Sequence, residues 1–224
     1  MASGVTGSIS GNDLVANNVG KNAIEVANNI TISGTGPDYK TIIIASDLTK
    51  AYGASTQFTA TLIDENGAAV ANKEVILTKG NDVLGVATTN ANGIAKFNIN
   101  LAVGTYTVNT GFDGDNVYAP KDTTNKIVVT KAATKITASK KTFKATTKTK
   151  KYTVTVKANN KALAKVKVTI KVNGKTYKAT TNSKGKATFK ITKLNKKGKY
   201  TATVKFAGNG SYKSSSAKAV ITVK

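Results

Sequence analysis

The chain has 224 residues, is 40% hydrophobic and carries a formal net charge of +23. It contains no Cys, His, Trp or Arg, so its 34 basic residues are all lysines. This composition excludes Ser/His/Asp and Cys/His catalysis and any zinc or copper site built on His or Cys, and we do not expect an enzyme.

Residues 1–37 are rich in Asn and in regularly spaced apolar side chains. The Asn residues are Asn12, Asn17, Asn18, Asn22, Asn28 and Asn29. This pattern is typical of the end of a parallel β-helix, in which Asn residues stack in ladders. An extra strand or a disordered tail is an equally open interpretation. Gly34-Thr35-Gly36-Pro37 has the composition of a linker that ends the segment.

Residues 38–131 predict a first domain made of short strands. The expected strands are 41–45, 55–63, 74–79, 82–89, 94–99, 105–112 and 124–130. Asn66-Gly67 and Asn92-Gly93 supply the residues that tight turns require between such strands. This number and spacing of strands favours an immunoglobulin-like Greek-key β-sandwich with two sheets.

Residues 132–224 predict a second domain of the same kind. Apolar residues from Val166 to Val172 and from Tyr200 to Phe206 alternate with Lys and Thr. Alternation with a period of two indicates strands that have one buried face and one wet face. The predicted fold class is therefore all-β, with two tandem sandwiches joined near residues 130–134.

An internal repeat supports the division into two domains. The segment Ala87–Ile99 recurs 92 residues later as Ala179–Ile191. Phe112, Gly114 and Tyr118 recur with the same spacing 94 residues later, as Phe206, Gly208 and Tyr212. A repeat of this length fits a whole small domain. Tyr106 and Tyr200 each stand where such sandwiches place a tyrosine corner, although each also fits a half-buried core aromatic.

Charged residues are distributed unevenly along the chain. Residues 1–130 contain 8 Lys and 11 Asp or Glu, whereas residues 131–224 contain 26 Lys and no acidic side chain. Such asymmetry indicates an acidic polymer as partner, whether nucleic acid, anionic lipid or cell-wall polymer.

The repeated motifs resemble a known family. The segments N-G-K-x-Y-x-A-T-T-N-S-K-G-K-A-T-F and G-K-Y-T-A-T-V-K-F-A-G-N-G-S-Y are similar to immunoglobulin-like repeats of adhesin-like surface proteins of methanogenic archaea. The resemblance covers residues 41–224. It implies adhesion or wall attachment without catalysis, and an extracellular location at the cell surface, with the signal and anchor outside this fragment.

The lysines suggest a binding surface. If the third and sixth strands of the second sandwich are neighbours, Lys165, Lys167, Lys199 and Lys205 share one exposed face. Lysine is a point charge without the planar fork of Arg, so this face favours diffuse attraction to a polyanion. A solvated surface that serves only solubility is the alternative.

Two further sites are predicted on short patterns. Asp64, Glu65, Asp113, Asp115 and Asn116 fall in loops at one end of the first sandwich and could offer oxygen ligands to Ca²⁺, although turn chemistry explains the same residues. Asn29 and Asn209 each begin an N-glycosylation triplet.

These features favour a non-catalytic surface adhesin. In this hypothesis the first domain is a spacer, and the second attaches to an anionic cell-wall polymer or to a partner cell. A purely structural stalk is the alternative, and nucleic-acid or other polyanion binding is third. We expect a monomer with no specific nucleic-acid partner. We also expect no membrane insertion, since no run of about 18 apolar residues occurs.

Overall fold

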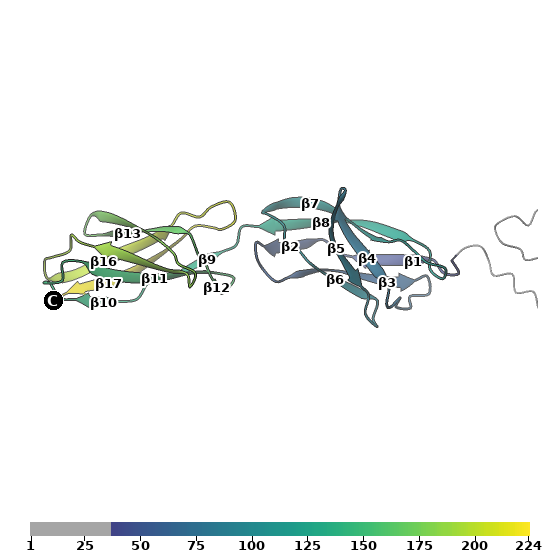
Figure 1. Ribbon diagram of the computed structural model, residues 1–224, viewed down its shortest axis with the longest axis horizontal. Coiled ribbons are helices and arrows are strands. Elements are labelled where there is room, and N and C mark those ends of the chain that lie inside the picture. Colours follow the sequence, from purple (N-terminus) through teal and green to yellow (C-terminus); the bar gives the residue numbers. More distant parts are fainter. Residues whose placement is uncertain (1–36) are drawn as a thin grey trace, which may run out of the picture.

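The structure is a computed structural model that describes residues 37–224, in which two groups of β-strands follow each other along the chain (Figure 1). We call residues 38–131 domain 1 and residues 132–224 domain 2. The strands of domain 1 are β1 (Thr41–Ala45), β2 (Leu48–Ala51), β3 (Gln57–Asp64), β4 (Glu74–Lys79), β5 (Asp82–Thr88), β6 (Ile94–Asn98), β7 (Gly104–Phe112) and β8 (Lys121–Thr130).

Domain 2 repeats this series. Its strands are β9 (Thr134–Thr137), β10 (Lys141–Phe143), β11 (Lys150–Ala158), β12 (Lys161–Ala162), β13 (Lys167–Val172), β14 (Lys175–Thr180), β15 (Lys186–Ile191), β16 (Gly198–Phe206) and β17 (Ser215–Val223). Within residues 37–224 no helix has the length and apolar character needed to cross a membrane.

Each domain is a sandwich of two sheets. In domain 1 a three-stranded sheet has the order β1-β3-β6, and a five-stranded sheet has the order β2-β8-β7-β4-β5. In domain 2 the five-stranded sheet has the corresponding order β10-β17-β16-β13-β14, while β11 pairs with β15 and with the short strands β9 and β12. The predicted all-β fold with two tandem immunoglobulin-like sandwiches is confirmed.

β2 is absent from the strands predicted for domain 1, and its counterpart in domain 2 is β10. β2 and β10 are short segments that pair in parallel with the last strand of their domain, Leu48 opposite Ile127 and Lys141 opposite Ile221. With four and three residues they are too short for a period of two to stand out from the sequence. Both lie at the edge of a five-stranded sheet.

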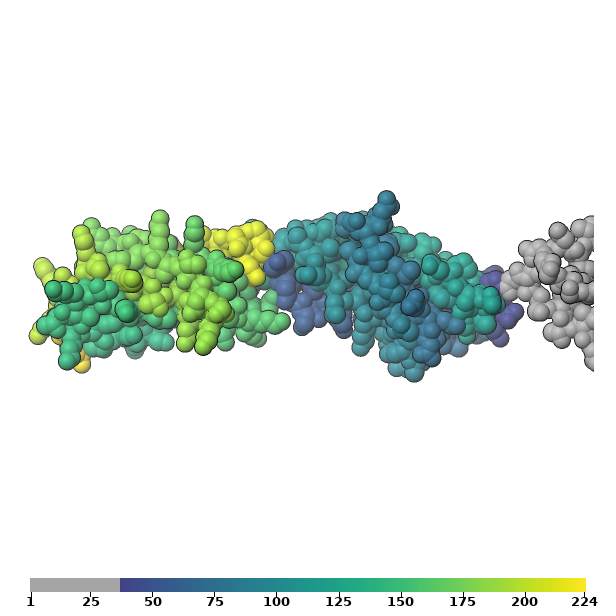
Figure 2. Space-filling view, in the orientation of Figure 1, coloured from purple at the N-terminus to yellow at the C-terminus, as the bar shows by residue number. Residues whose placement is uncertain are grey.

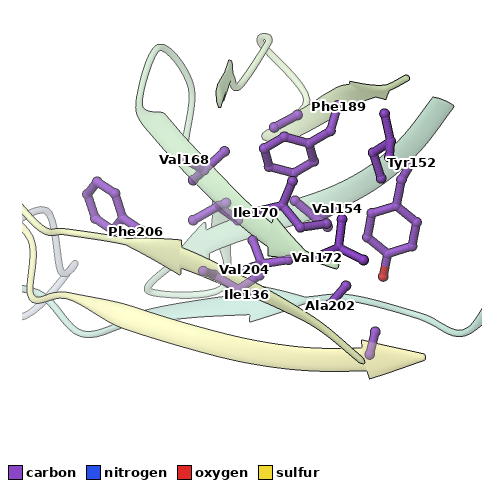
Figure 3. Close-up of a cluster of buried hydrophobic side chains, with 14 of the residues drawn as sticks. Ile136, Tyr152, Val154, Val168, Ile170, Val172, Phe189, Ala202, Val204 and Phe206 are labelled. Carbon is purple, nitrogen blue, oxygen red and sulfur yellow. The ribbon is translucent and has the colours of Figure 1, made fainter. Parts of the chain in front are cut away.

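The two sheets of each domain enclose a separate apolar core. In domain 1, Phe58, Leu62 and Leu77 are at most 1% exposed. Domain 2 buries Phe189, Ile170 and Tyr152 to the same degree (Figure 3). The buried Tyr152 hydroxyl donates a hydrogen bond to the carbonyl of Ser139 at 2.8 Å, which meets the requirement for a partner in an apolar interior.

Both predicted tyrosine corners are present. The Tyr106 hydroxyl donates to the carbonyl oxygen of Ala102 at 3.0 Å, and the Tyr200 hydroxyl donates to that of Lys196 at 2.8 Å. Each acceptor lies four residues upstream of its tyrosine. The rings also pack half-buried against their own core, so the two interpretations of these residues hold together.

The repeated Asn-x-x-Gly motif forms the same turn in both domains. The Oδ1 atom of Asn90 accepts hydrogen bonds from the backbone N–H groups of Asn92 and Ile94, and Asn182 accepts the equivalent pair. Gly93 has φ +72°, and a Cβ there would lie 2.3 Å from the Leu62 carbonyl oxygen. Any other residue would therefore strain the turn and collide with β3.

A small contact joins the ends of the two domains, which follow each other end to end (Figure 2). The Asn159 side-chain amide donates to the Tyr52 carbonyl at 2.8 Å, and the rings of Tyr52 and Tyr212 lie edge to face with centroids 5.6 Å apart. Ala132 pairs with Tyr212 as Tyr39 pairs with Tyr118 in domain 1. Domain 2 thus has the small residue Ala132 at the position where domain 1 has Tyr39.

The prediction of β-helix rungs, an extra strand or a tail in residues 1–37 falls, apart from its last residue, outside the described part of the chain.

Candidate polyanion-binding face

The outer face of the five-stranded sheet in domain 2 is built from lysines and hydroxyl residues. Because side chains alternate along a strand, the apolar residues of β13 and β16 point into the core while their lysines and threonines point outward. Six exposed lysines share this face, which we call the lysine face. They are Lys167, Lys171, Lys178, Lys199, Lys205 and Lys218.

The structure brings two of the four predicted binding lysines together. β13 pairs with β16, as expected of neighbouring strands, with Thr169 opposite Lys205. Lys167 lies two residues from Thr169 on the same side of β13, so Lys167 and Lys205 are close neighbours. Lys199 lies on the same face six residues along β16, about 20 Å away at ~3.3 Å per residue.

The structure corrects the prediction that Lys165 belongs to the exposed face. It precedes β13 with a φ of 58°, in the left-handed region, and its backbone N–H donates to the carbonyl of Thr181. The alternation of Lys and Val continues through this position in the sequence, but the strand begins only at Lys167. Lys165 is therefore outside the strand and is not part of the lysine face.

A hollow of about 910 Å³ lies at one end of the lysine face. Lys167, Lys178 and Lys205 line it together with the hydroxyls of Thr169 and Thr180. The run Ser214–Ser216, at the start of β17, completes its polar lining. The lining thus combines three lysines and five hydroxyl residues with the apolar Val168, Ala179, Phe206 and Ala207, and it contains no carboxylate.

Lys178 was missed from the sequence, although a signal was present. Asn173 and Gly174 have φ of 47° and 72° and form the two-residue turn of a hairpin. Such a turn fixes the register of its strands, here with Val172 opposite Lys175. Counting back from that pair places Lys178 beside Thr169, which the structure confirms.

Domain 1 has different side chains at the same places. Val75 pairs with Ala87 in domain 1 as Val168 pairs with Ala179 in domain 2. Gly111 pairs with Ile76 and Asp122, and Lys205 pairs in the same way with Thr169 and Ser216. This register aligns Lys167, Lys178, Lys205 and Ser216 of domain 2 with Glu74, Val86, Gly111 and Asp122 of domain 1. Three lysines in one domain therefore replace one carboxylate and two uncharged residues in the other, and a second carboxylate stands where domain 2 has a serine.

The other sheet of domain 2 also exposes lysines. Lys151 and Lys190 are direct cross-strand neighbours, and Lys157 and Lys186 point to the same side. Like charges directly opposite each other destabilise a sheet. None of these four lysines lines the hollow, which lies on the lysine face.

Two of the five residues of the candidate Ca²⁺ site, Asp64 and Asp115, have carboxylates that accept hydrogen bonds within their own turns. The Asp64 carboxylate accepts from the backbone N–H groups of Asn66 and Ala68. Asp115 accepts from Val117 and Tyr118 and forms an ion pair with Lys73 at 2.6 Å. Across residues 37–224, no three or more acidic side chains cluster in a way that would hold a metal. The geometry supports the turn interpretation for Asp64 and Asp115, and the five predicted ligands Asp64, Glu65, Asp113, Asp115 and Asn116 form no such cluster.

The Lys73 ammonium lowers the pKa of Asp115 to about 2, and the two backbone N–H groups add to this effect. In domain 2 the aligned residue is Asn209, whose Oδ1 accepts from Ser211 and Tyr212 at 2.9 Å. The turn is thus the same in both domains, and only the charge differs. Asn209 is exposed, as its predicted glycosylation requires, and Asn29 lies outside the described residues.

Two buried lysines were not expected from the sequence. Lys50 is 6% exposed, and its ammonium donates to the Ile99 carbonyl at 2.8 Å; burial lowers its pKa. Lys150 is fully buried and donates to the Thr147 carbonyl at 2.7 Å. Neither side chain is exposed for contact with a ligand, so the number of lysines alone overstates what a ligand meets.

Comparison with known proteins identifies the domain type. Residues 43–131 match the model of the bacterial Ig-like domain, group 3, and residues 123–223 match the model of a bacterial Ig-like domain. No curated protein matches the chain.

The chain is also similar to solved structures, at low sequence identity. Invasin, a bacterial integrin-binding protein, is 19% identical with a TM-score of 0.47, over 83% of this chain and 39% of its own. The adhesin InvE of Yersinia pseudotuberculosis is 18% identical with a TM-score of 0.32, over 81% of this chain and 58% of its own.

The fibronectin(III)-like modules of Clostridium thermocellum CbhA are 16% identical with a TM-score of 0.32, over 82% of this chain and 94% of their own. At this level of similarity the domain type rests on the two family models and on the strand order. The chain is therefore a tandem of two immunoglobulin-like domains, each matched by a bacterial Ig-like family model.

Proposed function

We propose that the chain is part of a non-catalytic surface adhesin in which domain 2 attaches to an anionic cell-wall polymer or partner cell and domain 1 is a spacer. The observation that carries this proposal is the lysine face. Six exposed lysines project from one sheet of a domain whose residues 131–224 contain no acidic side chain. A surface of one sign raises the local concentration of oppositely charged polymers.

The composition supports the non-catalytic part of the proposal. Without His or Cys, and with no cluster of acidic residues in the described chain, the groups that most enzymes use for acid–base or metal chemistry are not assembled. The resemblance to adhesin-like repeats of methanogenic archaea and the matches to bacterial Ig-like models favour an extracellular location.

The spacer role of domain 1 follows from its contrast with domain 2. Residues 1–130 are close to neutral, with 8 Lys against 11 acids, and domain 1 has two carboxylates where domain 2 has parts of the hollow. A near-neutral domain of the same shape extends the chain without competing for the polyanion.

Retention on purified wall material and on whole partner cells tests the proposal. The full chain and each domain alone, once shown to unfold cooperatively, are compared at about 0.15 M salt. We expect the full chain and domain 2 to be retained and domain 1 to be washed out. Equal and weak retention of both domains would contradict the proposal.

A structural stalk is the second candidate. The edge-to-face contact of Tyr52 with Tyr212 and the hydrogen bond from Asn159 hold the domains end to end, as a stalk requires. This function is favoured if neither domain binds any surface at about 0.15 M salt. DNA binding at low salt would not support a nucleic-acid role by itself, because residues 131–224, with 26 lysines and no acidic side chain, bind any polyanion under such conditions.

A further inference from the structure

The hollow at the end of the lysine face has features of a discrete site, beyond a generally basic surface. Its volume of about 910 Å³ falls in the range of small-molecule pockets. It is formed by four strands and the segment before β17, so its walls are regular secondary structure. Rigid strands position side chains better than loops do.

The lysines of the hollow surround one point of the sheet. Lys178 and Lys205 flank Thr169 on the two neighbouring strands, about 10 Å apart across β13 at ~4.8 Å per strand. Lys167 lies two residues along β13, about 7 Å from Thr169. Long flexible side chains at these distances can direct more than one ammonium group to the same anion.

Within residues 37–224, no carboxylate forms an ion pair with these ammonium groups. Surfaces that serve solubility usually intersperse charges of both signs. Here the three lysines line one hollow together with hydroxyl residues and the apolar Val168, Ala179, Phe206 and Ala207, and no acidic residue is among the lining. In domain 1 the aligned Glu74 and Asp122 reverse the charge of the same region, so the fold itself does not require lysines there.

The lining residues favour one class of ligand. Serine and threonine hydroxyls both donate and accept hydrogen bonds, which matches the hydroxyls of a sugar, while the ammonium groups match an oxyanion. The only aromatic ring in the lining is that of Phe206, which is 4% exposed and belongs to the core. A single-stranded nucleic acid would need exposed rings on which its bases stack.

We propose that this hollow binds a segment of an anionic polysaccharide, with Lys167, Lys178 and Lys205 contacting its sulfate, phosphate or carboxylate groups and Ser214 and Ser216 contacting its hydroxyls. The inference rests on the proposed function and deepens it, because it names the chemical class of the polymer and the place where it binds. The remaining lysines of domain 2 attract the same polymer without contacting it in a defined way.

The test compares two triple variants of the full chain that lose the same charge. The first, Lys167→Gln with Lys178→Gln and Lys205→Gln, alters the hollow. The control, Lys151→Gln with Lys186→Gln and Lys190→Gln, alters the opposite sheet. Affinities for heparin, polygalacturonate, inorganic polyphosphate, single-stranded DNA and neutral dextran are measured by calorimetry at about 0.15 M salt, after circular dichroism has shown that each variant is folded.

We expect the hollow variant to lose about tenfold or more in affinity for at least one charged polysaccharide, the equivalent of ~1.4 kcal/mol. The control should lose less than about threefold, and dextran should not bind. Heparin and polygalacturonate distinguish sulfate from carboxylate. Equal losses in the two triple variants would overturn the defined site but leave diffuse attachment, and hence the proposed function, in place.

A second pair of substitutions separates sugar recognition from charge. Ser214→Ala with Ser216→Ala keeps the net charge and is expected to weaken polysaccharide binding while leaving polyphosphate binding unchanged. Polyphosphate or DNA binding that matches polysaccharide binding in strength and in its response to all variants would overturn the assignment to a polysaccharide. Absence of binding to every polyanion would contradict both this inference and the proposed function.

Discussion

Domains 1 and 2 have the same strand order in their larger sheet, several identical turns and very different charge. Asn90 and Asn182 form identical turns, and Tyr106 and Tyr200 form identical tyrosine corners. On the outer face of the five-stranded sheet, in contrast, Glu74 aligns with Lys167. The charged residues that differ there are exposed.

This difference shows which features the fold requires. Turn and core positions hold similar residues in both domains because a change there costs free energy of folding. Exposed positions on a strand tolerate most polar residues at a cost within about 0.5 kcal/mol. Folding therefore does not require the exposed lysines of domain 2, and we expect their role to be in binding.

Removing a matched core ring should produce the largest difference in stability between the two domains. Phe97 pairs with Phe58, and Phe189 pairs with Tyr152 at the same place in domain 2. We expect Phe189→Ala to cost about 3–5 kcal/mol and to lower one calorimetric transition of the full chain by roughly 15 °C or more. Phe97→Ala, the matched control, should lower the other transition. If either variant shifts both transitions equally, the two domains unfold as one unit.

The sequence is sufficient to predict this fold for a physical reason. Strict alternation over Val166–Val172 and the Asn-x-x-Gly turns encode strands and their ends locally, and the repeat encodes them twice. The short strands β2 and β10 carry no comparable signal, because they are specified by their pairing with β8 and β17.

The candidate site is less predictable because it depends on register. Alternation alone placed Lys165 on β13, whereas its positive φ removes it from the strand. Lys178 joins the site only through the pairing of β13 with β14. Burial of Lys50 and Lys150 likewise depends on contacts with distant or turn carbonyls that composition does not reveal.

Salt should affect the stability of the two domains differently. The Debye length falls from about 30 Å at 0.01 M to about 8 Å at 0.15 M ionic strength, so repulsion among the lysines of domain 2 is screened at the higher value. We expect the Tm of domain 2 to rise as NaCl increases from about 0.01 to about 0.2 M. A gain of about 1 kcal/mol corresponds to roughly 4–8 °C.

Domain 1 is the control for the salt experiment, since its charges nearly balance and its Tm should hardly move. Sodium chloride and sodium sulfate at equal ionic strength separate screening from anion binding: screening alone gives equal shifts. A Tm of domain 2 that does not respond to salt would show that its lysines do not repel one another.

The tyrosine corners provide a change that should not distinguish the domains. Tyr106→Phe and Tyr200→Phe each remove a hydroxyl that donates to a carbonyl four residues upstream. We expect each to destabilise its own domain by about 0.5–1.5 kcal/mol, measured by urea unfolding. Losses that differ by more than about 1 kcal/mol would mean that the surrounding charge affects the corner, and would limit the equivalence of the two folds.

Acid provides the smallest expected difference. Asp115 has a pKa of about 2 in the folded protein, below its ordinary value of 3.8. A carboxyl whose folded pKa is depressed stabilises the folded state above its unfolded pKa, and this contribution is lost as pH falls through the folded value. We therefore expect domain 1 to lose stability between about pH 4 and pH 2, while domain 2, which has no acidic side chain, changes little.

Exchanging one residue tests whether this carboxylate is the cause. Asp115→Asn gives domain 1 the residue type that domain 2 has at Asn209, keeps an oxygen for the backbone N–H groups of the turn, and removes the charge that pairs with Lys73. The Tm of this variant should be lower than that of the unaltered protein at pH 5, and the two values should converge near pH 2. The reciprocal Asn209→Asp places a carboxylate in the lysine-rich domain, which should then acquire an acid-dependent loss of its own. If the Tm of domain 1 falls as steeply with acid in the Asp115→Asn variant as in the unaltered protein, the acid sensitivity belongs to other carboxylates, and the contrast between the domains then reflects their total charge and not this turn.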